Sequence, residues 1–469
     1  MGPVDSALKP PRHGSARAWT NRSDEMRQGL ECRLLAVVTM WIALSAVVFI
    51  VSPAAIAFAQ ATPSTTSRTI SDSNAAGSSL GELIDEALRQ SPLIVAARRH
   101  WEGETRMPIQ QATLPDPQIT FQNLAVGNPI PGNELQTNNF AYFGYGVAQE
   151  IPYPGKLKLR ASVAEKEAES ARAELEAQQR AVVEQVRESY FNLFYLTNSL
   201  NLLQQTYDEF QRVVHITGAQ YQLGMAQQQD VLKAQLEMTS ILNEEQTTRQ
   251  ESDQGQADLK ATLGREQDSP DIQVNNVQPT VLNLDDRQLR SLALSGSPVL
   301  KQAEALEQKS EQSLKLARQD YVPDFSISYM YQKTGAQFPD YYMASVGLTI
   351  PLYFWRKQTP EVEQAALEKE SSHAQTYASK LSVTSQVQNQ WIAVQSMERV
   401  LRIYSDGLIP QAQATLKSAV ATYRVGKVDF QTLLSAEVDV LRLQQQYYRA
   451  IADHEIAVAK IQQIIGNVR

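Results

Sequence analysis

The side chains that most often perform chemistry are few in this sequence and lie far apart. The chain has 469 residues, one cysteine and five histidines. The histidines are His13, His100, His215, His373 and His454. No H-E-x-x-H zinc sequence, phosphate-binding P-loop or G-x-G-x-x-G dinucleotide sequence is present. We therefore expect no catalytic residue, no cofactor site and no metal site, and a protein that is not an enzyme.

The N-terminal residues 1–59 are predicted to be a secretory signal peptide. An apolar run from Leu34 to Val51 leads to Ala57-Phe58-Ala59, which has the A-x-A form of a cleavage site. An uncleaved anchor helix is the alternative, because the run approaches the length of a membrane span. Residues 60–79 are expected to be the flexible N-terminus of the mature chain.

Cysteine use and net charge exclude further classes of function. Cys32 precedes the apolar run, so the mature chain is expected to contain no thiol, which excludes disulfides, thiolate metal sites and thiol catalysis. The formal net charge is −8, and it becomes −10 once residues 1–59 are removed. An acidic chain is a poor partner for phosphate backbones, so no nucleic-acid partner is expected.

The elements that position any functional residue occur twice, about 200 residues apart. We predict a first repeat over 80–270, a linker over 271–288 and a second repeat over 289–469. The recurring signals are Ser91-Pro92 with Ser297-Pro298, Pro115-Asp116 with Pro323-Asp324, Ile151-Pro152 with Ile350-Pro351, Tyr221-Gln222-Leu223-Gly224 with Tyr423-Arg424-Val425-Gly426, and Leu263-Gly264 with Ile465-Gly466.

Each repeat is predicted to contain a short helix, two strands and a long helical hairpin. The clearest strand is Phe325 to Tyr331, in which aromatic or aliphatic residues alternate with polar ones. Its partner, Tyr342 to Ile350, alternates in the same way. The expected strand pairs are about 117–151 and 323–351, and the expected hairpins are about 156–264 and 360–466.

This alternation suits strands with lipid on one side and water on the other, with Tyr329, Tyr331, Tyr341 and Tyr342 facing lipid. A half-buried sheet in a soluble domain is the alternative. Single-chain bacterial barrels begin at about eight strands, and open sheet edges are not tolerated in lipid. A membrane location therefore requires several chains to pool their strands.

The helical hairpins make up most of the chain. No proline lies between Pro154 and Pro270, and the segment is rich in good helix formers. Breaks at Gly218 to Gly224 and at Tyr423 to Lys427 divide each hairpin into two arms of roughly 50–60 residues, about 75–90 Å long. In the second hairpin, Pro410 predicts a kink that the first hairpin lacks.

Four stretches of the mature chain form a specific combination together with the duplication. They are Leu114-Pro115-Asp116-Pro117, Gln149-Glu150-Ile151-Pro152-Tyr153-Pro154-Gly155-Lys156, Ile409-Pro410-Gln411-Ala412, and Tyr423-Arg424-Val425-Gly426-Lys427-Val428-Asp429-Phe430 with Leu433-Leu434. With these stretches, essentially the whole mature chain, from Leu80 to Gly466, resembles the TolC-type outer membrane efflux proteins. The resemblance implies a mainly α-helical protein with membrane β-strands, whose trimer forms a twelve-stranded outer-membrane β-barrel continued by a long periplasmic α-helical barrel.

The function that the resemblance implies is an outer-membrane exit duct of a tripartite efflux system. Such a duct passively conducts substrates that reach it from an inner-membrane pump, expected to be of the RND type, and a periplasmic adaptor. The motifs resemble the heavy-metal, cobalt-zinc-cadmium branch more than the drug branch. The alternative function is a periplasmic coiled-coil adaptor or scaffold without a barrel, although an adaptor needs only one hairpin and this chain has two.

The resemblance also implies roles for the two hairpin turns. Leu223, Gly224, Met225, Val425, Gly426 and Lys427 correspond to tips that meet the adaptor. Each glycine also permits the chain to reverse, which is the structural alternative. Asp230, Tyr423 and Asp429 correspond to a pore constriction, where a threefold ring of carboxylates favours cations. The alternative role for Asp230 is to cap the returning helix.

Overall fold

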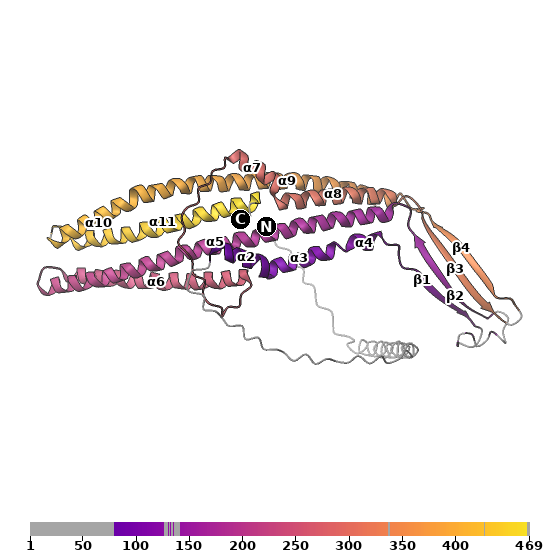
Figure 1. Cartoon of the computed structure of the whole chain (residues 1–469), viewed down its shortest axis with the longest axis horizontal. Coiled ribbons are helices and arrows are strands. Elements are labelled where there is room, and N and C mark those ends of the chain that lie inside the picture. The colour runs from indigo at the N-terminus through magenta and orange to yellow at the C-terminus, as the bar shows by residue number, and fades with distance from the viewer. Residues whose placement is uncertain are drawn as a thin grey trace, which may run out of the picture. The chain divides into compact units, whose positions relative to one another are not determined.

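The computed structural model of the protein describes residues 79–466, apart from 126–129, 131, 133–134, 136–140, 336–337 and 426. The expected signal peptide and nearly all of the expected flexible segment lie outside the described residues. The remainder is mainly helical, with one four-stranded sheet at one end of the helical bundle (Figure 1).

The first half contains three short helices, two strands and two long helices. The capping box of Ser79 and Glu82 begins the first helix, and Pro92 begins the second. The elements are α2 (Leu80–Gln90), α3 (Pro92–Glu104), α4 (Met107–Ala112), β1 (Gln118–Leu124), β2 (Tyr142–Ile151), α5 (Lys156–Gln222) and α6 (Gln228–Leu263).

The second half follows the same plan. Pro298 begins the helix before the strands, as Pro92 does in the first half. The elements are α7 (Asp286–Gly296), α8 (Pro298–Gln319), β3 (Asp324–Thr334), β4 (Tyr341–Thr349), α9 (Gln358–Ile403), the π-helix η1 (Tyr404–Leu408), α10 (Ile409–Arg424) and α11 (Phe430–Ile465).

The expectation of two similar arms in each hairpin is wrong. α5 has 67 residues, whereas α6 and α11 have 36 each. The reason is that the end of each short arm lies against the end of a separate, shorter helix, so that the two helices together run along the long arm. α6 ends at Gly264 against the start of α3, and α11 ends beside Gly296, just before α8 begins. Figure 1 shows α6 and α3 end to end along α5, with α11 and α8 end to end on the other side.

Near Pro410, where the sequence predicts a kink, the structure has a π-helix that ends at Leu408, directly before α10, whose second residue is the proline. Val182 and Val186 of α5 correspond to the buried Val383 and Val387 of α9. Beyond the π-helix, equivalent residues of the two repeats are separated by one more residue in the sequence than they are before it, as the pair Tyr221 and Tyr423 shows. One extra residue in the second repeat therefore accounts for the π-helix, which absorbs it without breaking the helix.

Several apolar clusters hold the helices together. The largest joins α2, α3, α5, α6 and α11 around Leu83, Val186 and Leu259, all at most 1% exposed. The linker before α7 is tied to α11, because Glu455 accepts hydrogen bonds from Thr280 N at 2.7 Å and Thr280 Oγ1 at 2.8 Å. None of the helices among the described residues combines the length and apolar character that crossing a membrane requires.

Candidate functional site

One face of the sheet is apolar and exposed across all four strands. The strands lie in the order β1-β2-β3-β4, and each antiparallel register places directly opposite residues on the same face. One row contains Phe121, Tyr145, Tyr331 and Tyr342, of which Phe121 is 73% exposed. Neighbouring rows contain Ile119, Val147, Tyr329 and Ala344, then Gln149, Ile327 and Val346, then Ile151, Phe325 and Leu348, so Gln149 is the one polar residue in these rows. A contiguous exposed apolar surface marks a membrane or protein contact.

The tyrosines form a band near the loop end of this face. Tyr145 and Tyr342 each lie 5.2 Å from Tyr331, measured between ring centroids. Tyr331 donates a hydrogen bond to Asp340 at 2.7 Å, so its polar end is bonded while its ring lies on the apolar face. Tyr341 was expected on this face, but it pairs with Gln332 and lies on the opposite one. The reason is that adjacent strand residues point to opposite sides.

The opposite face of the sheet carries mainly small and polar residues, together with Tyr341 and the facing pair Met330 and Met343. Ser328 and Ser345 are joined by a hydrogen bond of 2.7 Å. Gly144 and Gly146 lie so close to β3 that an added Cβ would sit 3.0 Å from the carbonyl oxygens of Tyr331 and Tyr329. The sheet therefore has one face suited to lipid and one suited to water.

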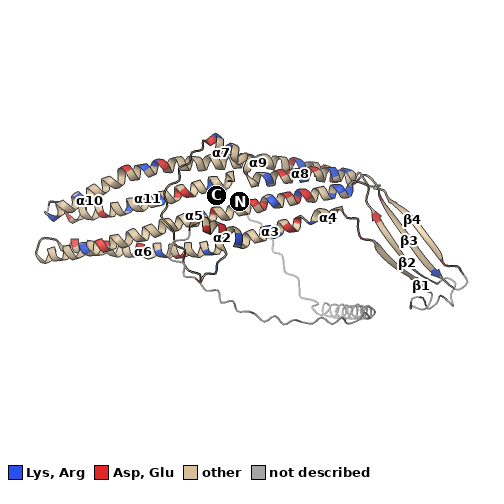
Figure 2. Ribbon diagram, viewed as in Figure 1, with Lys and Arg blue, Asp and Glu red and all other residues tan. Residues whose placement is uncertain are grey.

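Both outer strands of the sheet have a free edge. β1 and β4 pair on one side only, and most of their residues are exposed. The charged residues within the strands are Glu150, Asp324 and Lys333, all at or next to a strand end (Figure 2). Charged side chains are a common protection for exposed sheet edges, and neither β1 nor β4 contains one. These edges are thus suited to pairing with further strands.

A buried lysine joins the sheet to the helices. Lys156, the first residue of α5, is 2% exposed. Its Nζ donates to Asp324 Oδ2 at 3.0 Å and to Val322 O at 3.1 Å, and it lies 3.3 Å from Asp320 Oδ1. Asp324 Oδ1 also accepts from Tyr153 N at 2.7 Å. The Pro-Gly-Lys stretch of one repeat thus meets the Pro-Asp stretch of the other. The two motifs were visible in the sequence, but their contact was not.

The first hairpin turn is tight and exposed. Leu223 and Met225 are 72% and 77% exposed. Gly224 between them has φ = +74°, a left-handed conformation that favours glycine. Met225 N closes the turn by donating to Gln220 O at 2.8 Å. Gly224 therefore allows the chain to reverse direction, as predicted for its structural role. The turn leaves the side chains of Leu223 and Met225 exposed to solvent.

The second turn has the same character where it is described. Val425 is 66% exposed, and Lys427 N donates to Thr422 O at 3.0 Å. Gly426, the equivalent of Gly224, lies outside the described residues. The two hairpins are bridged near their turns, because Lys233 donates to Gln431 Oε1 at 3.0 Å.

The three residues expected at a constriction all lie near the turns. Asp230, the third residue of α6, accepts a hydrogen bond from the N–H of the N-cap residue Gln227 at 3.2 Å and so completes a capping box. Asp429 caps α11 by accepting from Thr432 N at 3.1 Å, and the Thr432 hydroxyl and N–H lower the pKa of its carboxyl. Tyr423 donates to Gln220 at 3.0 Å, and burial followed by the nearby charge of Asp230 raises its pKa. Two acids are thus caps, and the tyrosine joins the hairpins.

Sequence reasoning missed a carboxylate pair between α5 and α11. Burial, followed by a hydrogen bond with Glu209 and the negative charge of Glu209, raises the pKa of Glu437 to about 8. Glu437 is half-buried, whereas Glu209 is exposed beside Arg212. No spacing pattern could reveal this pair, because its members are far apart in sequence and belong to different hairpins.

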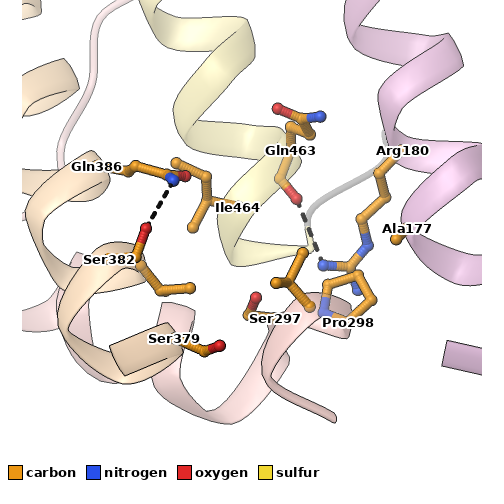
Figure 3. Close-up of a pocket in the computed structure, with 11 residues that line it drawn as sticks. Ala177, Arg180, Ser297, Pro298, Ser379, Ser382, Gln386, Gln463 and Ile464 are labelled. Carbon is orange, nitrogen blue, oxygen red and sulfur yellow. Dashed lines mark hydrogen bonds between the residues drawn. The ribbon is translucent and has the colours of Figure 1, made fainter. Parts of the chain in front are cut away.

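A small cavity lies where α8 and α11 meet. Its volume is about 160 Å³, and Arg180, Ser297, Pro298, Ser382 and Gln386 are among its lining residues (Figure 3). Arg180 Nη1 donates to Gly296 O at 3.0 Å and to Gln463 O at 3.4 Å, so the guanidinium caps carbonyls at the ends of α7 and α11. Burial lowers the pKa of this guanidinium. Within the described ranges, no three His, Cys, Asp or Glu side chains are grouped to hold a metal ion.

Comparison with known proteins agrees with this arrangement. The family described as "Outer membrane efflux protein" matches residues 83–265 and 289–467. Outer membrane protein TolC of Vibrio cholerae serotype O1 is 20% identical over 420 residues, which cover 83% of this chain and 91% of that protein.

Solved outer-membrane channels have the same fold. The Campylobacter jejuni CmeC outer membrane channel superposes with a TM-score of 0.73 at 13% identity, covering 88% of this chain and 94% of that one. The outer membrane protein VceC of Vibrio cholerae gives a TM-score of 0.69 at 17% identity, covering 82% and 96%. These matches confirm both the resemblance drawn from the sequence and the predicted fold class.

Proposed function

This chain belongs to the outer membrane efflux protein family and is an outer-membrane exit duct, and we propose that three copies form it by pooling their sheets. The observation that carries the proposal is the sheet, which has an exposed apolar face, a polar face and two free edges. Four strands cannot close on themselves at a useful diameter, whereas three copies supply twelve. A scaffold without a membrane part would have no use for the apolar face.

The partners of such a duct are a periplasmic adaptor and an inner-membrane pump, here proposed to be of the RND type. We assign adaptor contact to the hairpin turns, namely Leu223, Gly224, Met225, Val425, Gly426 and Lys427. The exposure of Leu223, Met225 and Val425 supports this assignment, because exposed apolar side chains at the end of a long hairpin are suited to packing against another helical hairpin.

Conduction through the duct is proposed to be passive. The family is one of transport proteins, and we propose that this chain performs no chemistry on its cargo. Asp230, Tyr423 and Asp429 are proposed to line the constriction near the hairpin turns. Three copies of Asp230 would form a ring of negative charge that favours cations over anions.

The test is single-channel recording of the purified protein in a planar bilayer. We expect stepwise currents with a preference for cations. Asp230→Asn should lower that preference, because the amide oxygen can still cap α6 but the charge is lost. Asp253→Asn, an equal change of charge further along α6, is the control. An absence of any current from protein that has inserted as a trimer would contradict a conducting duct.

A further inference from the structure

The two repeats allow the observed strand register to be checked against the sequence. The Pro-Asp motifs make Asp116 equivalent to Asp324, and the Ile-Pro motifs make Ile151 equivalent to Ile350. Counting from these anchors, the pair Gln118 with Ala148 between β1 and β2 becomes Ser326 with Gly347 between β3 and β4. Ser326 and Gly347 are indeed partners. The equivalence therefore predicts register correctly where both strands belong to one chain.

The same equivalence between the repeats also predicts a register for β4 with β1, a pairing that does not occur within one chain. β2 pairs with β3, so the equivalent of this pairing is β4 with β1, and these are the two free edges. The pair Gly146 with Met330 translates into Ser345 with Gln122. The pair Val147 with Tyr329 translates into Val346 with Phe121.

The translated register is consistent with the two faces of the sheet. Val346 and Phe121 are 76% and 73% exposed and lie on the apolar face, so pairing them continues that face across the junction. Ser345 and Gln122 lie on the polar face. A register shifted by one residue would place apolar side chains against the polar face. Neither observation was used in the counting.

An ionic contact should accompany this pairing. Within the chain, Asp324 at the start of β3 binds Lys156 at the start of α5. The equivalent residues are Asp116 before β1 and Lys357 before α9, since Lys156 precedes Val182 by the same number of residues as Lys357 precedes Val383. Both side chains are exposed and neither forms an ion pair or hydrogen bond within the described part of the chain. Asp320 and Asp324, near Lys357 in the same recess, are already bound by Lys156.

We propose that β4 pairs with β1 of a neighbouring copy in the register Ser345 with Gln122, and that Lys357 binds Asp116 of the neighbouring copy. This inference rests on the proposed assembly and adds to it the residues that decide how the copies align. The contact would fix the sheet of one copy to the helices of the next, as Lys156 does within one copy.

The register is tested by disulfide mapping in a Cys32→Ser background, which leaves no native cysteine. Ser345→Cys is combined in turn with Thr120→Cys, Gln122→Cys and Leu124→Cys, which share one face. Directly opposite residues lie about 4.5–5.5 Å apart between Cα atoms, within disulfide reach, whereas positions two residues away lie about 7–8 Å apart. We expect covalent dimers and trimers from Gln122→Cys, with a large loss of them for the other two. Ser328→Cys with Ser345→Cys should cross-link within one chain and serves as the control.

The outcomes separate this inference from the proposed function. Strongest cross-linking through Thr120→Cys or Leu124→Cys would overturn the register. A trimer seen by mass in detergent without any interchain disulfide would overturn the β4–β1 pairing and leave the channel intact. A monomer by mass would contradict the proposed assembly itself.

The ionic contact is tested by exchanging its charges. Lys357→Glu and Asp116→Lys should each lower the temperature at which the trimer dissociates in detergent, and the double variant should recover most of that loss. Arg356→Glu makes the same charge change one residue away and is the matched control. Rescue of Arg356→Glu by Asp116→Lys, or no rescue of Lys357→Glu, would overturn the assignment.

Discussion

At the scale of single residues, Lys156 carries the junction between the sheet and the helices. Its ammonium is almost fully buried, whereas Asp320 and Asp324 are about a quarter exposed in their side chains. Removing one partner of a buried ion pair is costly because the remaining charges lose their compensation. The ammonium of Lys156 thus connects the start of α5 with the end of α8 and the start of β3.

Replacing this lysine should therefore destabilise the protein measurably. We expect Lys156→Met to lower the free energy of unfolding by roughly 2–4 kcal/mol, the lower values reflecting the solvent that reaches the two carboxylates. Denaturant titration of the detergent-solubilised protein measures this change. Lys158→Met removes an exposed lysine two residues away and should have little effect. Equal effects from both variants would contradict the role of Lys156.

The carboxylate pair of Glu437 and Glu209 predicts a pH dependence. The pKa of Glu437 is raised in the folded protein to about 8, so the folded state favours the protonated carboxyl. The resulting stability is fully present below the ordinary glutamate pKa and is lost as the pH rises through about 8. The contact between α5 and α11 should therefore loosen between pH 5 and pH 9.

Hydrogen exchange measures that loosening. Amides of α11 near Glu437 should lose protection as the pH rises, after correction for the intrinsic exchange rate. Glu437→Gln cannot ionise, so it should remove most of this dependence. Glu251→Gln, on the exposed side of α6, is the control. Unchanged pH dependence in Glu437→Gln would show that other groups are responsible.

At the scale of elements, Gly218 and Gly224, the two glycines next to the first hairpin turn, should respond to substitution in opposite ways. Gly224 has a left-handed backbone, which costs a residue with a Cβ about 1–2 kcal/mol, although open space surrounds it. Gly218 lies inside α5 with open space around it, so alanine there should stabilise the helix by about 0.5–1 kcal/mol.

Two quantities are measured: the protection of hairpin amides from hydrogen exchange, and the binding of the adaptor. Gly224→Ala should lower both. Gly218→Ala should raise amide protection and leave adaptor binding unchanged. Normal adaptor binding by Gly224→Ala despite a loosened turn would contradict the docking role of this turn.

Local sequence rules predicted some elements well and others poorly. Alternation in Phe325 to Tyr331 follows the actual strand because its side chains meet two different environments. The prediction for Tyr341 is wrong because this residue lies at a strand end, where the presence of an aromatic residue does not indicate which face of the sheet its side chain occupies. The stacking of α6 on α3 and of α11 on α8 could not be predicted, because it depends on contacts between distant segments.

The candidate site divides in the same way. The reversal at Gly224 could be predicted, since the residue type itself indicates the backbone conformation. The contacts of Lys156 with Asp324, and of Glu437 with Glu209, join different repeats and have no local signature. Comparing the repeats with each other recovers part of this information, as the register of β3 and β4 demonstrates.

At the scale of the whole molecule, the two faces of the sheet should tolerate charge very differently. Val346 lies on the apolar face and Ser345 on the polar face of the same strand. An arginine facing lipid costs about 2–4 kcal/mol near the middle of the bilayer, whereas one facing water costs little. Val346→Arg should therefore reduce the amount of assembled protein in outer-membrane fractions, and Ser345→Arg should not. Equal yields would contradict a lipid-facing sheet.

The mass of the protein extracted from outer-membrane fractions shows whether several copies of this chain share one channel. The extraction uses mild detergent, and the measured mass is corrected for bound detergent. A duct built from pooled sheets predicts three times the mass of the mature chain, released by detergent and not by salt. A monomer or dimer released by salt alone would contradict the shared channel.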